Sequence, residues 1–179
     1  MWEALKGPNK DVYNFANVDP YAASQLYSAD RRESLPHLEQ LIQVNDILIF
    51  DRYVESNLLH QGGKFPTEEE REKFGRWLYD FEYGMLKLPP PHVTVYLELP
   101  FEVSQKRAQL RAQSTGGQLD AVERDLVYVR NGHEAGMFYA KTFNWLSIPC
   151  VRDDGYELTR VEVHQLVVEK IRPRLNLKF

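Results

Sequence analysis

The sequence has few of the features that would place the protein outside the reducing interior of a cell. Cys150 is the only cysteine among the 179 residues, so an internal disulfide and a cysteine metal cluster are both excluded. No apolar run approaches the roughly 18 residues that a membrane-spanning helix needs. Residues 1–7 lack the apolar core of a secretory signal peptide. These absences predict a cytoplasmic protein with no membrane partner.

The sequence also has little excess of one sign of charge over the other. The formal net charge is only −4, which gives no reason to expect nucleic acid or an anionic membrane surface as a partner. Hydrophobic residues make up 43% of the chain and charged residues 27%, which is typical of a globular protein. We therefore expect residues 1–179 to form a single domain.

Short apolar runs alternate with helical patterns along the chain. The runs predict buried strands at residues 47–50, 93–99 and 147–151. The helical patterns predict helices at residues 19–44, 67–86, 101–113, 120–145 and 159–171, the first kinked or restarted at Pro36 and the last with Val161 and its apolar neighbours inward. Asp19 and a Thr67–Glu70 capping box mark two helix starts. The alternation indicates an α/β fold with a parallel sheet between helices, although three strands are few for this many helices.

The stretch from residue 47 to residue 61 carries the clearest functional signal. Asp51 and Arg52 directly follow a predicted strand, and ligands bind at such strand ends in open α/β sheets. A carboxylate there can hold a Mg²⁺–water shell, and an arginine offers a planar fork of donors to a phosphate. The alternative is that Asp51 caps a helix while Arg52 makes a surface ion pair. The residues that follow at helical spacing could line one face of a helix leaving the site: Ser56, Asn57, His60 and Gln61.

A second candidate lies upstream, on the first predicted helix. Tyr27 and Arg31 are four residues apart and therefore share a helix face. An aromatic ring beside a guanidinium can stack on a nucleobase and donate to one of its carbonyls. The alternative is that Tyr27 is simply a core residue.

These two segments resemble the signatures of the thymidylate kinase family. The pattern Asp-Arg-Tyr-x-x-Ser-x-x-x-x-Gln begins at Asp51, and Leu-Tyr-Ser-Ala-Asp-Arg ends at Arg31. The resemblance implies a kinase that uses ATP and Mg²⁺ to convert dTMP into dTDP. It implies that Tyr27 stacks on thymine, that Arg31 reads its O4, that Arg52 grips the monophosphate and that Asp51 lies near the metal.

The resemblance extends to the rest of the predicted site. It implies that Ser56, Asn57 and Gln61 line the thymine pocket. His60 stands where family members often have a tyrosine against the sugar, so selection against ribonucleotides and the choice between dTMP and dUMP are left open. A surface histidine is the alternative.

Three further arginines are implied on the ATP side. Arg107 and Arg111, four residues apart before a Gly-Gly tip, resemble lid arginines that neutralise phosphate charge, although a basic helix face is the alternative. Arg152 follows the last strand, where the family holds adenine. A homodimer packed through long helices is also implied. The candidate faces are two apolar stripes that could equally be core: Phe74, Trp77, Phe81 and Met85, and Leu38, Leu41 and Ile42.

One sequence motif of the family does not occur in this sequence. The string Gly-x-x-x-x-Gly-Lys-Ser/Thr, which cradles ATP phosphates, does not occur. The resemblance therefore predicts a three-layer, P-loop kinase-like parallel sheet flanked by helices, without its first, central strand and P-loop. Such a chain is expected to turn over poorly and fold poorly alone. The alternative to a kinase is a non-catalytic dTMP-binding or scaffold protein; the Asp-Arg-Tyr match argues against a deoxynucleoside kinase.

Overall fold

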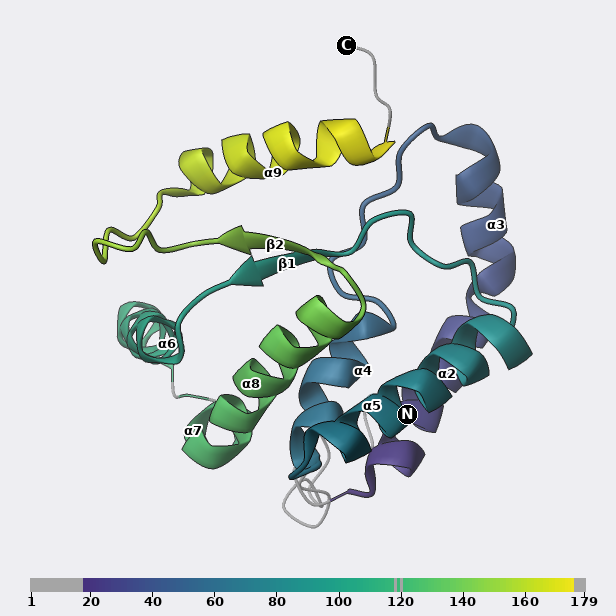
Figure 1. Ribbon diagram of the computed structural model, residues 1–179, viewed down its shortest axis with the longest axis horizontal. Helices are drawn as coiled ribbons and strands as arrows, with labels where there is room; N and C mark the ends of the chain where they lie inside the picture. Colours follow the sequence, from purple (N-terminus) through teal and green to yellow (C-terminus); the bar gives the residue numbers. More distant parts are fainter. Residues whose placement is uncertain (1–17, 118, 120, 176–179) are drawn as a thin grey trace.

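The computed structural model describes residues 18–117, 119 and 121–175, so residues 1–7 and the predicted helix start at Asp120 lie outside the described part. Helices dominate it, as Figure 1 shows. The elements in chain order are α2 (Pro20–Glu33), α3 (Leu35–Val44), α4 (Glu55–His60), the 3₁₀ turn η1 (Gly62–Lys64), α5 (Glu68–Tyr79), the π-helix η2 (Asp80–Met85), β1 (Val95–Glu98), α6 (Phe101–Thr115), α7 (Ala121–Arg124), α8 (Leu126–Thr142), β2 (Leu146–Pro149) and α9 (Arg160–Leu175).

The sheet of the described residues consists of β1 and β2. The two strands are parallel, with Val95 opposite Leu146 and Glu98 opposite Pro149. In Figure 1 α9 covers one side of this pair and α8 lies on the other. The prediction of an α/β fold with a parallel sheet is confirmed at this level.

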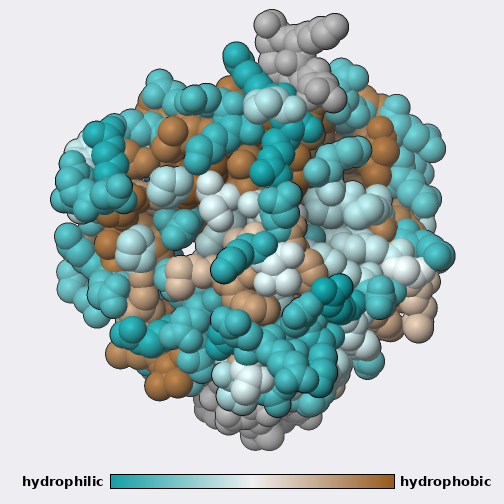
Figure 2. All heavy atoms as spheres, viewed as in Figure 1, coloured by the Kyte–Doolittle hydropathy of each residue, from teal (hydrophilic) through white to brown (hydrophobic). Residues whose placement is uncertain are grey.

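The buried strand predicted at residues 47–50 is wrong. These residues form neither helix nor strand, and Ile49 is 91% exposed. A short strand is stabilised by ladder hydrogen bonds to a neighbour, and in the described sheet only β1 and β2 pair. Figure 2 shows hydrophobic atoms exposed at the upper right, where Figure 1 places α3 and the segment after it. Exposed apolar side chains in this region are Ile42, Val44, Ile47, Ile49 and Phe50.

The predicted helix starts are confirmed in detail. The Asp19 carboxylate accepts from the backbone N–H of Ala22 at 2.9 Å, with Pro20 at the first helical position. The Thr67 hydroxyl accepts from the N–H of Glu70 at 3.2 Å, and the Glu70 carboxylate accepts from the N–H of Thr67 at 3.3 Å. Each bond satisfies a helix-terminal N–H that has no partner within its helix. The restart at Pro36 is also confirmed, because α3 begins at Leu35.

Two predictions about the later helices need correction. The single helix predicted at 120–145 is divided, because Asp125 caps α8 by accepting from the N–H of Tyr128 at 3.0 Å. A capping residue has non-helical backbone angles, so α7 stops before it. Val161, predicted to face inward on α9, is 65% exposed. Among residues 18–117 and 121–175, no helix has the length and apolarity needed to cross a membrane.

The hydrophobic core lies between α4, α5 and α8. Phe74, Leu78 and Tyr139 are fully buried in it, and Leu38 joins the same cluster. Two residues of the stripes predicted as dimer faces, Phe74 and Leu38, are therefore core residues. Other stripe residues remain exposed, Met85 and Ile42 among them.

Glycines allow α8 to pass very close to η1. A Cβ on Gly63 would lie 2.9 Å from backbone atoms of Asn131 and Gly132, closer than real Cβ atoms approach. Backbone cannot move aside as a side-chain end can, so only glycine fits. The packing of α8 against α4, and thus the shape of the site described below, depends on this contact.

We expect Gly63→Ala to lower the free energy of unfolding by about 1–3 kcal/mol, because it overpacks a fixed backbone contact. Urea unfolding followed by circular dichroism measures the change. Gly84→Ala is the matched control, since a Cβ there meets nothing within 4 Å. Equal unfolding midpoints for the two variants would contradict the close approach.

Candidate functional site

The two sequence signals meet where α2 faces the segment before α4. Tyr27 is half-buried on α2. Burial raises the pKa of its hydroxyl, and the guanidinium groups of Arg52 and Arg31 act against this rise. Both arginines are therefore near enough to the ring to act on it electrostatically. The structure thus brings together three of the predicted site residues.

Arg31 is held by a carboxylate that the sequence analysis missed. Glu82, on η2, is fully buried and accepts from Arg31 Nε at 3.1 Å and from its Nη2. The same carboxylate accepts from the hydroxyl of Ser28 at 2.7 Å. A local pattern could not show this pairing, because Glu82 lies 51 residues from Arg31.

Arg52 has a strained backbone. Its φ is +73°, in the left-handed region that residues other than glycine and asparagine rarely adopt. Strain of this kind costs on the order of 1–3 kcal/mol and gathers at functional sites. Arg52 and Asp51 are both exposed. Among the ion pairs of the described residues Arg52 has none, and α4 has Val54 rather than Asp51 at its cap position. The alternative of a helix cap with a surface ion pair is therefore wrong.

The helix predicted after Arg52 is α4, and it turns two amides inward. Asn57 is 4% exposed and Gln61 1% exposed. Asn57 Nδ2 and Gln61 Oε1 are buried without a hydrogen-bond partner. Buried polar atoms normally have hydrogen-bond partners, so these two atoms are candidates to bond to a ligand or a water molecule. Ser56 and His60, on the neighbouring face, are half-buried.

His60 lies against a second aromatic residue that the sequence analysis missed. Its ring stacks on Tyr128 of α8, with centroids 6.2 Å apart and planes at 17°. Burial raises the pKa of Tyr128 to about 12, and Tyr27 adds to the rise. Tyr128 is thus close to both Tyr27 and His60. His60 is half-buried in this cluster, and its role beside the sugar stays a prediction.

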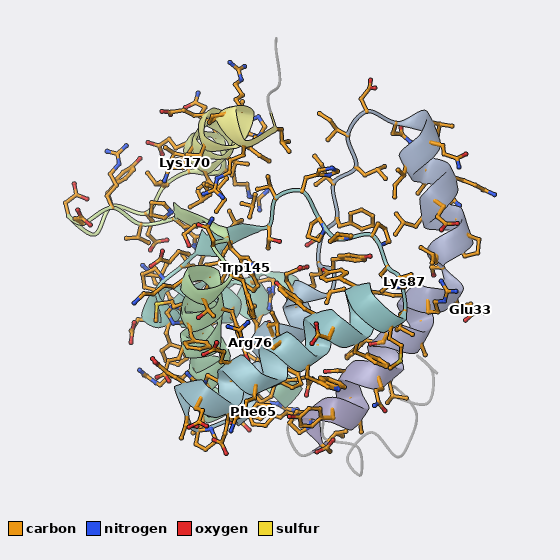
Figure 3. All side chains as sticks on the ribbon, turned by 45° about the vertical axis from the view of Figure 1, so that its right-hand side comes forward. Glu33, Phe65, Arg76, Lys87, Trp145 and Lys170 are labelled. Carbon is orange, nitrogen blue, oxygen red and sulfur yellow. The ribbon has the colours of Figure 1, made fainter. Side chains whose placement is uncertain are left out.

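A polar network continues from the site into the interior. Tyr83 donates to Glu55 Oε1 at 2.7 Å, and Trp145, at the end of α8 that leads to β2 (Figure 3), donates to the Tyr79 hydroxyl at 3.2 Å. Burial raises the pKa of Glu55, and the hydrogen bond from Tyr83 partly opposes this. Burial also raises the pKa of Tyr53 to about 12, with Arg31 opposing. Tyr79 also hydrogen-bonds to Glu55, so the network joins α4, α5 and η2.

The three arginines implied on the ATP side lie elsewhere. Arg107 pairs with Glu157 at 3.2 Å, and Arg111 pairs with Glu123. Arg152 pairs with Glu162 at 3.1 Å. Their partners are on α7, α9 and the loop before α9 rather than on α2 or α4. In Figure 1 α6 lies beyond α8 from α2, so the structure does not gather Arg107 and Arg111 around Arg52.

Comparison with known proteins identifies the family of the chain. The family model described as thymidylate kinase matches residues 11–148. A thymidylate kinase of Mycobacterium tuberculosis (strain CDC 1551 / Oshkosh) is 32% identical over 124 residues, which is 69% of this chain and 56% of the relative. The chain belongs to the thymidylate kinase family.

Other relatives of the family give the same result. A thymidylate kinase of Staphylococcus haemolyticus (strain JCSC1435) is 33% identical over 114 residues, covering 62% of this chain and 52% of the relative. One of Limosilactobacillus fermentum (strain NBRC 3956 / LMG 18251) is 24% identical over 164 residues, covering 90% and 69%. The matched part of the chain thus spans about half the length of the first two relatives.

The family implies ATP and Mg²⁺, and the donor set can be tested against both. No group of three His, Cys, Asp or Glu side chains that could hold a metal occurs among the described residues. Mg²⁺ in phosphoryl-transfer sites is usually held by one or two carboxylates together with phosphate oxygens. The exposed carboxylate of Asp51, next to Arg52, could hold Mg²⁺ in this way, together with the oxygens of a bound phosphate. For ATP the described residues offer the cations of α6.

The buried carboxyl of Glu55 should make stability depend on pH. Its folded pKa lies above the unfolded value of about 4.3, so the folded state binds the proton more tightly. Its contribution is fully present below the unfolded pKa and is lost as the pH rises through the folded pKa. Gln cannot ionise. We therefore expect the melting temperature of Glu55→Gln, relative to the unmodified chain, to rise as the pH increases above the unfolded pKa of about 4.3.

Thermal melting across this pH range measures the effect. Glu39→Gln, a change at an exposed position of α3, is the control and should show no such trend. A difference between Glu55→Gln and the unmodified chain that stays constant with pH would contradict the raised pKa.

Proposed function

We propose that this chain binds dTMP as the phosphoryl acceptor of an ATP-dependent kinase reaction that yields dTDP and ADP. The observation that carries the proposal is the meeting of Tyr27, Arg31 and Arg52 at one place, from two segments far apart in the sequence. One aromatic ring and two guanidinium groups match one base and one phosphate. Membership of the thymidylate kinase family and the two motifs support the same assignment.

Binding of the base would use α2 and α4 together. The Tyr27 ring offers a stacking face, and Arg31 offers N–H donors to the O4 carbonyl of thymine. Asn57 Nδ2, buried without a partner, is a donor for a second carbonyl or a bridging water. Ser56 lies on α4 and Gln61 directly follows it, and His60 with Tyr128 forms an aromatic wall that would face the sugar.

Phosphoryl transfer would depend on positioning and charge. Arg52 is placed to bind the monophosphate as a bidentate, charge-assisted pair. Mg²⁺, when bound, supplies positive charge to the phosphate oxygens, and Asp51 would hold its water shell. Arg107 and Arg111 would have to leave Glu157 and Glu123 and move towards Arg52. Exposed ion pairs contribute little, so their loss would oppose this closure only weakly.

The quaternary structure is part of the proposal. A homodimer is implied by the family, and Ile42 and Met85 are exposed residues of the two apolar stripes that could take part. A second function is a non-catalytic chain that binds dTMP without transfer. In the structure Arg107 and Arg111 pair with Glu157 and Glu123 and do not lie at Arg52, and this arrangement is the observation that favours the second candidate.

The function is tested by measuring ADP release with dTMP, ATP and Mg²⁺ in a coupled assay. A kinase should turn over at roughly 1–100 per second. Binding of dTMP without ADP release would support the second candidate. Absence of dTMP binding by calorimetry would contradict both.

We expect Arg52→Ala to weaken dTMP binding by more than about 1.5 kcal/mol, because it removes a charge-assisted pair with the phosphate. Thymidine has no phosphate, so its affinity should not change. Isothermal titration with both ligands measures the difference. Arg32→Ala, an exposed arginine of the same size on α2, is the control. Equal losses for dTMP and thymidine would remove Arg52 from the phosphate.

A further inference from the structure

Glu82 is a fully buried carboxylate that the proposed reaction does not use. It touches α2 through two residues, Ser28 and Arg31. A buried charge is costly unless it is paired and hydrogen-bonded. Burying Glu82 therefore costs free energy at a position that an apolar residue could fill. The residue that Glu82 binds, Arg31, is one of the three that carry the proposed site.

The contacts orient the Arg31 guanidinium. Glu82 Oε2 accepts from Nε at 3.1 Å, and Oε1 accepts from Nη2. These bonds occupy the edge of the guanidinium that contains Nε and Nη2, so Nη1 is the nitrogen turned away from Glu82. The Ser28 hydroxyl lies 2.7 Å from Oε1 and 2.8 Å from the carbonyl oxygen of Ser24, and it shares its single proton between these two acceptors. The carboxylate is thereby fixed from the α2 side as well.

The widened helix η2 places this carboxylate. The N–H of Leu86 donates to the carbonyl of Phe81 at 2.9 Å, five residues back, which is the π-helical spacing. Two consecutive side chains of η2 then reach partners in the interior. Glu82 accepts from Arg31 of α2, and Tyr83 donates to Glu55 of α4. Short π-helical turns occur frequently at functional sites, and here the turn supplies the partner of Arg31.

We propose that Glu82 is a positioning residue that selects the base by holding Arg31 with its Nη1 donors towards the pocket. In this orientation the site accepts a pyrimidine with a carbonyl at carbon 4 and disfavours one with an amino group there, because two donors would meet. This inference rests on the proposed binding of dTMP. It adds the residue through which Arg31 discriminates.

Loss of the Glu82 charge has a specific consequence. An arginine without its carboxylate is free to turn, so its Nη1 donors are no longer held towards the base. Base selection should then weaken, while the gain in affinity from the phosphate is kept. A general structural defect would instead weaken the binding of every ligand alike.

The test measures the affinities of dTMP, dCMP and thymidine for the full chain and for Glu82→Gln by calorimetry. We expect the preference for dTMP over dCMP to fall about tenfold, the loss of one charge-assisted hydrogen bond. The ratio of dTMP to thymidine affinity should stay the same. Glu39→Gln is the control, because it removes the same charge at an exposed position of α3, away from Arg31. It should keep the dTMP preference.

A double-mutant cycle tests whether Glu82 acts through Arg31. In the Arg31→Ala background, Glu82→Gln should change the dTMP-to-dCMP ratio no further. An unchanged ratio in the single variant, or an equal further loss in the double variant, would overturn the inference. If Glu82→Gln does not fold, as judged by circular dichroism, Ser28→Ala replaces it. That change removes one donor to the carboxylate and should lower the ratio about threefold; an unchanged ratio would overturn the inference in that case.

The measurements separate this inference from the proposed function. A chain that binds dTMP and keeps its base preference in Glu82→Gln contradicts only the positioning role. A chain that does not bind dTMP contradicts the proposed function, and the positioning role with it.

Discussion

One guanidinium group serves two carboxylates in the interior of this molecule. Glu82 binds Arg31 directly, and the charge of Arg31 also acts on Glu55. Separating a buried carboxylate from its paired cation costs several kcal/mol. The Arg31–Glu82 pair therefore holds α2 against η2, and the hydrogen bond from Tyr83 to Glu55 holds η2 against α4. Because Arg31 and Arg52 both act on Tyr27, the position of the Arg31 guanidinium also bears on the shape of the candidate site.

The predictions that succeeded rest on interactions between residues close in sequence. The Asp19 cap and the Thr67 capping box bond three residues along the chain, so the sequence alone shows them. The sharing of a helix face by Tyr27 and Arg31 is likewise a matter of helical spacing. The parallel pairing of β1 and β2 was predictable because a helix separates the strands. The proximity of Arg52 to Tyr27 came from the family resemblance.

The failures concern interactions between distant segments. Residues 47–50 are apolar enough for a strand, but pairing depends on a neighbouring strand, which a local pattern cannot supply. Glu82 looks like an ordinary surface glutamate of a helix until α2 packs against it. Tyr128 shows no local sign that it stacks on His60. The Gly63 contact with α8 is of the same kind, since an isolated Gly-Gly pair indicates only a loop.

At Arg52, whose backbone is left-handed, a change that stabilises the fold would weaken ligand binding. Glycine adopts such angles without the steric cost that a side chain meets, so it would relieve strain there on the order of 1 kcal/mol. The same change would delete the guanidinium. Laboratory evolution that selects for thermal stability alone would therefore favour glycine at this position and yield proteins that are more stable but bind the ligand less tightly. Only a selection that also rewards binding would retain the arginine.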